Sequence, residues 1–340
     1  MNKALKTILD TWRDCFIHLS RIAILFSCGL TWAALFSNAG LVFDLPCHFR
    51  LQYAIAQALF VAAAVAGYLK NRDLFKTAKT SLGNNFLAEV GLAAISLVLN
   101  LFLIGVLYLP AAQKSTAQSP VLRCLQINVN TRNQSYGKVA ALVHKYNADV
   151  VALQEIDDNW LTALKNKLPD YPYVAARPRP DNFGIAIFSR LKLYDQKIEG
   201  FGSAHVPTIL ARLEFDGAPV TVVSTHPLPP VGTEALNMRN EQLKLLGEAR
   251  SKWERTVVLM GDLNSTSWAQ IFKELCTKAD LMDTRQGFGI QPTWPTYSRT
   301  LWIPLDHCLV SKDLVVRQRK VCETIDSDHF PVFIELSRKK

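Results

Sequence analysis

Beyond Leu125, six short polar clusters follow apolar runs, and together they carry the residue types that hydrolyse phosphoesters. The clusters are Gln126-Ile-Asn128, Leu153-Gln-Glu155, Ser224-Thr-His226, Gly261-Asp-Leu-Asn264, Leu305-Asp306 and Ser327-Asp-His329. Each places a carboxylate, an amide or an imidazole where a buried strand would end. Phosphoester hydrolysis needs a metal ion beside the phosphate oxygens, an activated water and stabilisation of the leaving oxygen. One cluster alone means little, but the whole series predicts a metal-dependent phosphoesterase.

Three side chains are candidates for the metal site: Glu155, Asn128 and Asp328. Glu155 follows the buried run DVVAL and Gln154, where an unpaired carboxylate would be costly. The alternative is a glutamate at a helix start, stabilised by the helix dipole. Asn128 at a strand end suits the surroundings of the metal, and Asp328 is a further ligand. Hard oxygen ligands of this kind favour Mg²⁺, with Mn²⁺ as the alternative ion.

Two further candidates, Asp262 and Asn264, follow the apolar run VVLM. Residues i and i+2 of an extended segment point the same way, so both side chains would reach one site. We expect Asp262 to orient and deprotonate water and Asn264 to donate to a phosphoryl oxygen. The structural alternative is an Asp/Asn turn that caps the helix near Trp268.

Two imidazoles complete the predicted catalytic set. His329 can stabilise charge near the phosphate if a carboxylate orients its other nitrogen, and Asp306 is the predicted partner. His226 would be a second imidazole for the phosphoryl group or the leaving oxygen. A lone histidine of this kind is more often a packed or capping residue. His307 should point to the opposite face from Asp306, so we leave it out of the site.

Basic residues near these clusters are candidates for substrate binding. Arg177, Arg179 and Asn182 form a loop that we expect to contact phosphate, and Arg239 is a further candidate with a solvated helix charge as its alternative. Aromatic residues stand close to Arg299 within residues 294–299, a combination found in single-strand binders or in a packed loop. A long basic trough would favour nucleic acid, and a closed pocket would favour a phospholipid or sugar-phosphate head group.

The first 110 residues differ in kind from the rest. Apolar segments at 22–43, 51–69 and 86–109 approach or exceed the ~20 residues that a helix needs to cross a bilayer. They are apolar around the full helical turn, which argues against a soluble bundle. The first begins too late for a cleaved signal peptide, and two more follow. We therefore predict a membrane anchor at 1–110, a linker at 111–120 and a catalytic domain at 121–340.

The loop charges predict the orientation of this anchor. Basic residues concentrate before the first segment and in the second loop: Lys3, Lys6, Arg13, Arg21, Lys70, Arg72, Lys76 and Lys79. Cytoplasmic loops carry such charges, so the N-terminus would lie inside and the catalytic domain outside, in the periplasm of a Gram-negative cell. The same loops supply much of the net charge of +9, which is therefore weak support for nucleic-acid binding.

The outer domain carries Cys124, Cys276, Cys308 and Cys322, and an oxidising compartment permits disulfides among them with the pairing left open. No Cys or His spacing typical of zinc is present. The sequence indicates no protein partner.

Mixed strands and helices must position these clusters. We expect strands at 121–129, 149–153, 183–188, 209–215, 219–224, 256–260, 305–310 and 330–335, with helices at 136–146, 159–168, 234–253 and 268–275. The late strand density is too high for a simple alternating parallel sheet. Two packed sheets with helices on their outer faces fit better, and the clusters would converge on one edge.

Motif content and order resemble the endonuclease/exonuclease/phosphatase superfamily, with its DNase I-like four-layer α/β sandwich, over residues 122–336. The resemblance rests on QINVN, LQE, STH, GDLN, the Asp306 strand and SDHFPV. It implies that Asn128 and Glu155 serve the metal, that Asp262 and Asn264 handle water and phosphate, and that an Asp306–His329 pair is completed by Asp328 and His226. The N-terminal region resembles a bacterial inner-membrane subgroup, in which PTWP and THPLPP segments recur.

The resemblance implies hydrolysis of phosphodiester or phosphomonoester bonds, and a nuclease is slightly favoured. The alternatives are a phospholipid or sugar-phosphate phosphoesterase and a catalytically silent scaffold that keeps the fold. All positions of the expected machinery hold competent residues, which argues against the scaffold.

Overall fold

The computed structural model describes residues 3–70, 86–110 and 119–339. Most of the predicted linker (111–118) and of the second basic loop (71–85) lies outside the described residues. The chain divides into two compact units, Met1–Gly105 and Val106–Lys340.

The first unit is helical. Its elements are α1 (Lys3–Ala33), η1 (Ala34–Ala39), α2 (Leu41–Cys47), α3 (Arg50–Lys70) and α5 (Phe86–Gly105). Three helical segments are long and apolar enough to cross a membrane: Cys15–Ala39, Arg50–Leu69 and Phe86–Tyr108. The first helix begins well before the predicted apolar segment, and a 3-10 turn ends it before Gly40.

The few polar residues of these helices face one another. Asn100 donates to Thr31 Oγ1 at 3.0 Å and to Gln57 Oε1 at 3.1 Å, and all three side chains are buried. Arg21 pairs with Glu89 at 2.6 Å. Interhelical hydrogen bonds of this kind hold apolar helices together where burial of apolar surface cannot, as in a bilayer.

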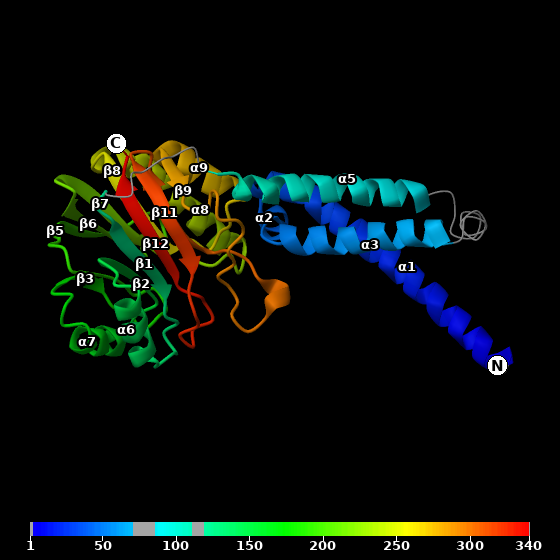
Figure 1. The fold of residues 1–340 in the computed structure, drawn as a ribbon, viewed down its shortest axis with the longest axis horizontal. Coiled ribbons are helices and arrows are strands. Elements are labelled where there is room, and N and C mark those ends of the chain that lie inside the picture. The colour runs from blue at the N-terminus through cyan, green and yellow to red at the C-terminus, as the bar shows by residue number, and fades with distance from the viewer. Residues whose placement is uncertain (1–2, 71–85, 111–118, 340) are drawn as a thin grey trace. The chain divides into compact units, whose positions relative to one another are not determined.

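The second unit is a four-layer sandwich of two six-stranded sheets with helices on both outer faces (Figure 1). The first sheet has the order β11-β12-β1-β2-β4-β3. Its strands are β1 (Leu122–Asn128), β2 (Val150–Gln154), β3 (Tyr173–Arg177), β4 (Ile185–Ser189), β11 (Leu314–Val321) and β12 (Val332–Arg338). Helices α6 (Tyr136–Lys145) and α7 (Asp158–Lys167) cover its outer face, where they share a core with β1, β2 and β4.

The second sheet has the order β5-β6-β7-β8-β10-β9. Its strands are β5 (Tyr194–Gly200), β6 (Pro207–Phe215), β7 (Ala218–Thr225), β8 (Thr256–Asp262), β9 (Leu281–Asp283) and β10 (Asp306–Ser311). The remaining helical elements of this unit are η2 (Val106–Tyr108), α8 (Thr233–Glu248), η3 (Ala249–Lys252), α9 (Gln270–Ala279) and η4 (Arg299–Leu301). The predicted DNase I-like sandwich is confirmed.

Alternation along the strands explains both the core and the site. In β1, Leu122 and Cys124 point between the sheets, while Leu125 and Ile127 point toward α6 and α7. The positions that continue the inner face are Gln126 and Asn128, because side chains two residues apart share a face. The space between the sheets is therefore apolar along most of its length and polar at one edge.

Four strands escaped the sequence prediction: β3, β5, β9 and β11. All except β11 have little buried apolar alternation to detect, and β5 is almost entirely exposed. In β11 a register shift between Val316 and Gln318 interrupts the alternation. The seven cysteines are free thiols, so none of the permitted disulfides is present.

Candidate active site

The site lies where two parallel strand pairs end. β1 runs parallel to β2 and pairs Asn128 with Gln154, while β7 runs parallel to β8. The antiparallel partner β10 pairs Asp306 with Asp262. Carboxyl ends of parallel strands meet at one edge, and the sandwich brings the ends of both pairs together.

Two buried glutamines, Gln126 and Gln154, support the site from between the sheets. Gln126 Nε2 donates to Gln154 Oε1 and to Asp306 Oδ1, both at 2.8 Å, and Gln154 Nε2 donates to Ser224 Oγ at 3.1 Å. All four side chains are fully buried. Sequence reasoning placed these glutamines in the polar clusters without assigning them a role. Their position on the inner face of β1 and β2 is the signal that would have found them.

Asn128 connects the predicted metal ligand, Glu155, to the predicted base, Asp262. Its Nδ2 donates to Glu155 Oε1 at 2.9 Å and to Asp262 Oδ2 at 3.1 Å. Burial by itself would raise the pKa of Glu155, but hydrogen bonds from His226 and Asn128 outweigh it and hold that pKa below its usual range. Glu155 is thus an anion, as a metal ligand must be.

His329 stands between two buried carboxylates. Its Nδ1 lies 2.8 Å from Asp306 Oδ2, and its Nε2 lies 3.5 Å from Asp262 Oδ2. Burial would lower the pKa of His329, but the charges of Asp306 and Asp262 outweigh it and raise the pKa to about 10. Burial also acts to raise the pKa of Asp306, yet His329 keeps it below its usual range. At neutral pH the pair is therefore an imidazolium and a carboxylate.

His226 approaches the same centre from β7. Its Nδ1 lies 3.1 Å from the Asp262 carbonyl oxygen, and its Nε2 lies 3.6 Å from Glu155 Oε1. The ring of Phe183 lies over it with centroids 5.6 Å apart. Burial would lower the pKa of His226, but Glu155 and Asp262 outweigh burial and raise it. Both predicted imidazoles therefore lie beside the predicted base.

Asp262 is the central acid of the group. It is 1% exposed, and burial raises its pKa against the opposing effect of His329. The main-chain nitrogen of Asn264 donates to its Oδ1 at 2.9 Å. Asn264 has a positive φ of 48°, which directs its Nδ2 to the Pro227 carbonyl at 2.9 Å.

Arg239 lies on α8, and its guanidinium reaches the loop after β8. Its side chain is fully buried in α8, so the alternative of a solvated helix charge is wrong. Its Nη1 donates to the Asn264 carbonyl oxygen at 2.9 Å. The guanidinium therefore points toward the loop of Asp262 and Asn264 and not toward the solvent.

The other predicted substrate residues lie on a loop beside Glu155. The main-chain nitrogen of Arg179 donates to the Ile156 carbonyl at 3.0 Å. Its guanidinium forms an ion pair with Asp181. Arg177 and Asn182 are exposed. Half of the predicted positive charge of this loop is thus already compensated.

Asp328 is held by two donors. Asn130 Nδ2 donates to its Oδ1 at 2.8 Å, and Trp294 Nε1 donates to its Oδ2 at 3.1 Å. Sequence reasoning missed Asn130 and did not give Trp294 a role at the site. His307 is fully buried with its Nε2 2.8 Å from the Ser265 carbonyl, on the side away from Asp262.

Two groups of side chains in the described residues have the composition of metal sites: Asp262 with Asp306 and His329, and Asp44 with Cys47 and His48. In the second group each imidazole nitrogen already has a partner, because Asp44 lies 3.3 Å from Nε2 and Cys47 lies 3.5 Å from Nδ1. The first group lies in the candidate active site.

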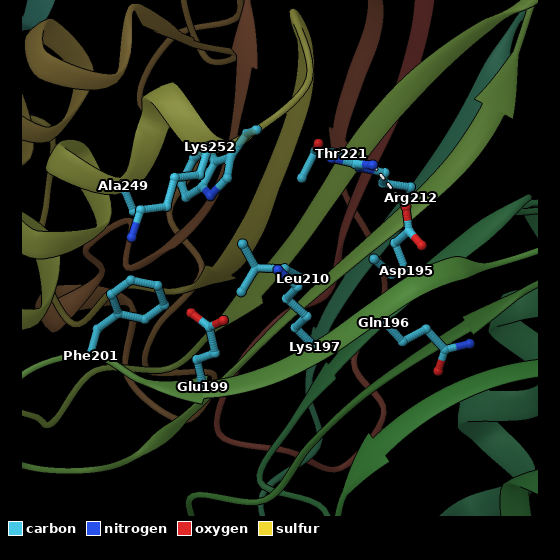
Figure 2. A pocket seen from close by; sticks show the side chains of 12 residues that line it. Asp195, Gln196, Lys197, Glu199, Phe201, Leu210, Arg212, Thr221, Ala249 and Lys252 are labelled. Atoms are coloured by element: carbon cyan, nitrogen blue, oxygen red, sulfur yellow. Dashed lines mark hydrogen bonds and ion pairs between the residues drawn. The ribbon is translucent and has the colours of Figure 1, made fainter.

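A separate pocket of about 340 Å³ lies along β5 and β6 (Figure 2). Leu210, Arg212 and Thr221 line it, and Arg212 pairs there with Asp195 at 2.7 Å. Thr221 precedes His226 by five residues on an extended strand, roughly 16 Å at 3.3 Å per residue. The pocket is therefore distinct from the catalytic centre.

Residues 125–329 match the Endonuclease/Exonuclease/phosphatase family. No curated protein matches the sequence. Solved structures with the same fold include a humanised D. rerio TDP2, at 18% identity and a TM-score of 0.56 over 64% of this chain and 99% of that one. A family protein from Bacteroides thetaiotaomicron matches at 21% identity and a TM-score of 0.54, over 66% and 100%. The human Nocturnin catalytic domain with bound sulfate matches at 20% identity and a TM-score of 0.53, over 65% and 96%.

Proposed function

Because the chain belongs to the endonuclease/exonuclease/phosphatase family, whose members hydrolyse phosphoester bonds, we propose that it is a Mg²⁺-dependent phosphoesterase held at a membrane by its first unit. The observation that carries the proposal is the convergence of Glu155, Asp262 and the Asp306–His329 pair on one edge of the sandwich. These groups come from both sheets and are almost wholly buried. A fold alone does not require such a costly assembly of charges.

The donor set fits a hard divalent cation. Four carboxylates meet here, from Glu155, Asp262, Asp306 and Asp328. The imidazolium of His329 offsets one of these charges, and His226, whose pKa is raised by Glu155 and Asp262, lies beside them as a second imidazole. We propose that Glu155 and Asp328 hold the ion and that Asn128, the third residue predicted at the metal site, orients Glu155 through its hydrogen bond to Oε1. A bound Mg²⁺ would neutralise the non-bridging phosphate oxygens.

The chain's own residues position the water and the charge. Burial raises the pKa of Asp262, so it is a stronger base toward a water than an exposed aspartate. Its Oδ1 is fixed by the Asn264 nitrogen, which leaves Oδ2 to face His329 and Asn128. We propose that Asp262 orients the water for in-line attack on phosphorus.

The imidazoliums would stabilise the charge that develops on the phosphate. Asp306 holds Nδ1 of His329, so the Nε2 proton is directed into the site. His226 presents its Nε2 on the Glu155 side. In this proposal Arg239 acts on Asn264 through its carbonyl and does not contact substrate, whereas Arg177, Arg179 and Asn182 border the site as substrate contacts.

The test is hydrolysis of bis-p-nitrophenyl phosphate by the detergent-solubilised full chain with Mg²⁺. Asp262→Asn should lower kcat by about 10²–10⁴-fold, because general-base catalysis contributes that much. Asp280→Asn is the matched control, since Asp280 is exposed and paired with Lys312. Near-wild-type turnover by folded Asp262→Asn would exclude the mechanism.

We further propose that the first unit spans the bacterial inner membrane with the N-terminus in the cytoplasm and the catalytic unit in the periplasm. Three segments have the length and composition of membrane spans, and many of their large apolar side chains are exposed. A green fluorescent protein fused after Lys340 should stay dark in this topology, whereas alkaline phosphatase at the same position should be active. Fluorescence with silent phosphatase would reverse the orientation.

Nucleic acid and phospholipid head groups are the two substrate classes to separate, and the sequence slightly favours the first. A supercoiled plasmid nicked with Mg²⁺, and left intact by Asp262→Asn, would identify a nuclease. The positive charge around the site supports nucleic-acid binding less than the sequence suggests. Arg239 is buried and Arg179 is paired, so neither contributes to a basic trough.

A further inference from the structure

Most of the exposed large apolar side chains of the catalytic unit lie on two loops near the candidate active site. Among the described residues beyond Ser119, four large apolar side chains are exposed: Ile198 (43%), Val231 (87%), Tyr297 (72%) and Leu301 (42%). All but Ile198 lie on two loops, residues 226–232 after β7 and residues 293–303 before β10. We call Val231, Tyr297 and Leu301 the rim.

Hydrogen bonds place both loops beside the catalytic residues. Asn264 Nδ2 donates to the Pro227 carbonyl, in the first loop, at 2.9 Å. In the second loop the Thr296 nitrogen donates to the Asp328 carbonyl at 2.9 Å, next to His329. The second loop, drawn in orange, projects beyond the sheets (Figure 1). The two loops that carry the rim are therefore bonded to the candidate active site, one at Asn264 and the other at Asp328.

The same region is bonded to the end of the third candidate span. That span ends at Tyr108, and its last residues, Val106–Tyr108, belong to the catalytic unit. Gly287 and Gly289 donate to the Leu107 carbonyl at 2.9 and 3.0 Å, and Gln286 Nε2 donates to the Val106 and Leu109 carbonyls at 2.8 Å. Within the catalytic unit, residues 286–289 are thus bonded to residues 106–109, and the second rim loop begins four residues later in the sequence.

The composition of the rim suits a lipid surface. Tyr297 combines an apolar ring with a polar tip, Leu301 is apolar, and Arg299 between them lies over the Trp302 ring at 5.5 Å. Aromatic and apolar side chains beside arginine are typical of segments that lie in the membrane interface, where the cation meets anionic lipid phosphate. Two of the rim side chains, Tyr297 and Leu301, share one loop, and exposed apolar side chains that gather in this way mark an interaction site.

We infer that the rim contacts the bilayer that holds the chain's own helices and presents the phosphoester of a lipid head group to the site. The contact stands on the exposure and bonding described above. The substrate class rests in addition on the proposed phosphoesterase function. In the reaction, water adds to phosphorus and the bond to the leaving oxygen breaks, with one proton passing to that oxygen.

Photo-crosslinking in nanodiscs of phosphatidylethanolamine and phosphatidylglycerol tests the contact. p-Benzoylphenylalanine in place of Val231, Tyr297 or Leu301 should attach to lipid on irradiation of the full chain. The control is Ile198, which is as exposed as Leu301 (43% against 42%) but lies on β5 near the separate pocket. Lipid adducts at the rim at least tenfold above those at position 198 are expected. Equal yields at all four positions would overturn the contact.

Turnover separates the contact from the chemistry. Leu301→Ser should raise the KM for the lipid phosphoester in nanodiscs at least tenfold and leave kcat/KM for soluble bis-p-nitrophenyl phosphate within twofold. Rim crosslinks with no hydrolysis of any phosphoester would refute the proposed function and leave the contact standing. Hydrolysis of plasmid DNA with no lipid adducts would overturn the inference and identify a nuclease.

Discussion

Replacing Asp306 by asparagine removes one charge from the centre of the site without changing the size of the side chain. Gln126 Nε2 donates to Asp306 Oδ1 at 2.8 Å, so the new amide must keep its oxygen on that side. Its nitrogen then faces His329 Nδ1, which is now 2.8 Å from a carboxylate oxygen. Two donors cannot face each other, so His329 must give up its Nδ1 proton and become neutral.

The expected loss of activity follows from that change of protonation. The pKa of His329 stands at about 10 because Asp306 and Asp262 outweigh burial, and Asp306 is the larger influence. The neutral ring keeps its Nε2 proton directed into the site but loses its positive charge. Weakening one such stabiliser of developing charge costs up to about 10²–10³ in kcat. We therefore expect kcat of Asp306→Asn to fall about 10²–10³-fold, or about 3–4 kcal/mol in the activation free energy at 1.36 kcal/mol per decade.

The assay is hydrolysis of bis-p-nitrophenyl phosphate with Mg²⁺ from pH 6 to 10. The raised pKa of about 10 keeps wild-type His329 largely protonated up to about pH 9, so its titration adds no alkaline loss below that pH. In the variant the remaining cationic fraction is lost as pH rises, so residual activity should decline across the same range. Asp280→Asn controls for the loss of a surface carboxylate. Activity within tenfold of wild type, in a variant with unchanged far-UV circular dichroism, would refute the reasoning.

Three further predictions concern the support of the site. Gly261→Ala would place a Cβ 1.9 Å from the Thr225 carbonyl oxygen, so β7 and β8 must separate, and we expect a loss of about 2–4 kcal/mol seen as a lower Tm. Gly137→Ala, with open space around it, should leave Tm unchanged, and equal Tm values for the two variants would contradict this account. Arg239→Met removes the donor to the Asn264 carbonyl and should lower kcat about tenfold with KM retained; a change in KM alone would make it a substrate contact. Treatment with EDTA should abolish hydrolysis and lower Tm, and Mg²⁺ should restore both, whereas full activity in EDTA would exclude a metal cofactor.

The sequence predicts the fold class and the chemistry of the site for the same physical reason. Inner-face positions of β1 and β2 are apolar at Cys124 and Val150 and become polar at Gln126 and Gln154. Such a switch within a buried strand is costly unless the polar groups meet partners. Strand ends with abrupt polar residues therefore mark the point where strands converge, and the order of motifs identifies the family. Its residue match from 125 to 329 agrees with that interpretation.

What the sequence could not show depends on contacts between distant elements. Arg239 stands on a polar helix that reads as solvated, and only the approach of the loop after β8 turns it into a buried support for Asn264. The exposed rim shows the reverse case, because its sequence suits a buried loop although its side chains are exposed. Tyr297 stands among prolines and aromatics that also suit a packed loop, and its exposure depends on the course of residues 293–303. Neither environment is encoded in the local pattern of residues.

Backbone conformation at Glu155 shows how the fold holds the proposed metal ligand against a local preference. Its φ is +62°, a left-handed conformation that costs an L-residue about 1–2 kcal/mol. Two hydrogen bonds flank the turn, from the Ile156 nitrogen to the Gly184 carbonyl at 3.1 Å and from the Arg179 nitrogen to the Ile156 carbonyl at 3.0 Å. A Cβ on Gly184 would lie 1.8 Å from the Ile156 carbonyl oxygen, so only glycine permits that approach. The loop of Arg177 and Arg179 thus fixes the strained turn, and the same segment that borders the substrate side also directs Glu155 toward Asn128 and His226. Strain of this kind persists only where surrounding contacts over-determine it, which is the condition expected of a residue kept for chemistry.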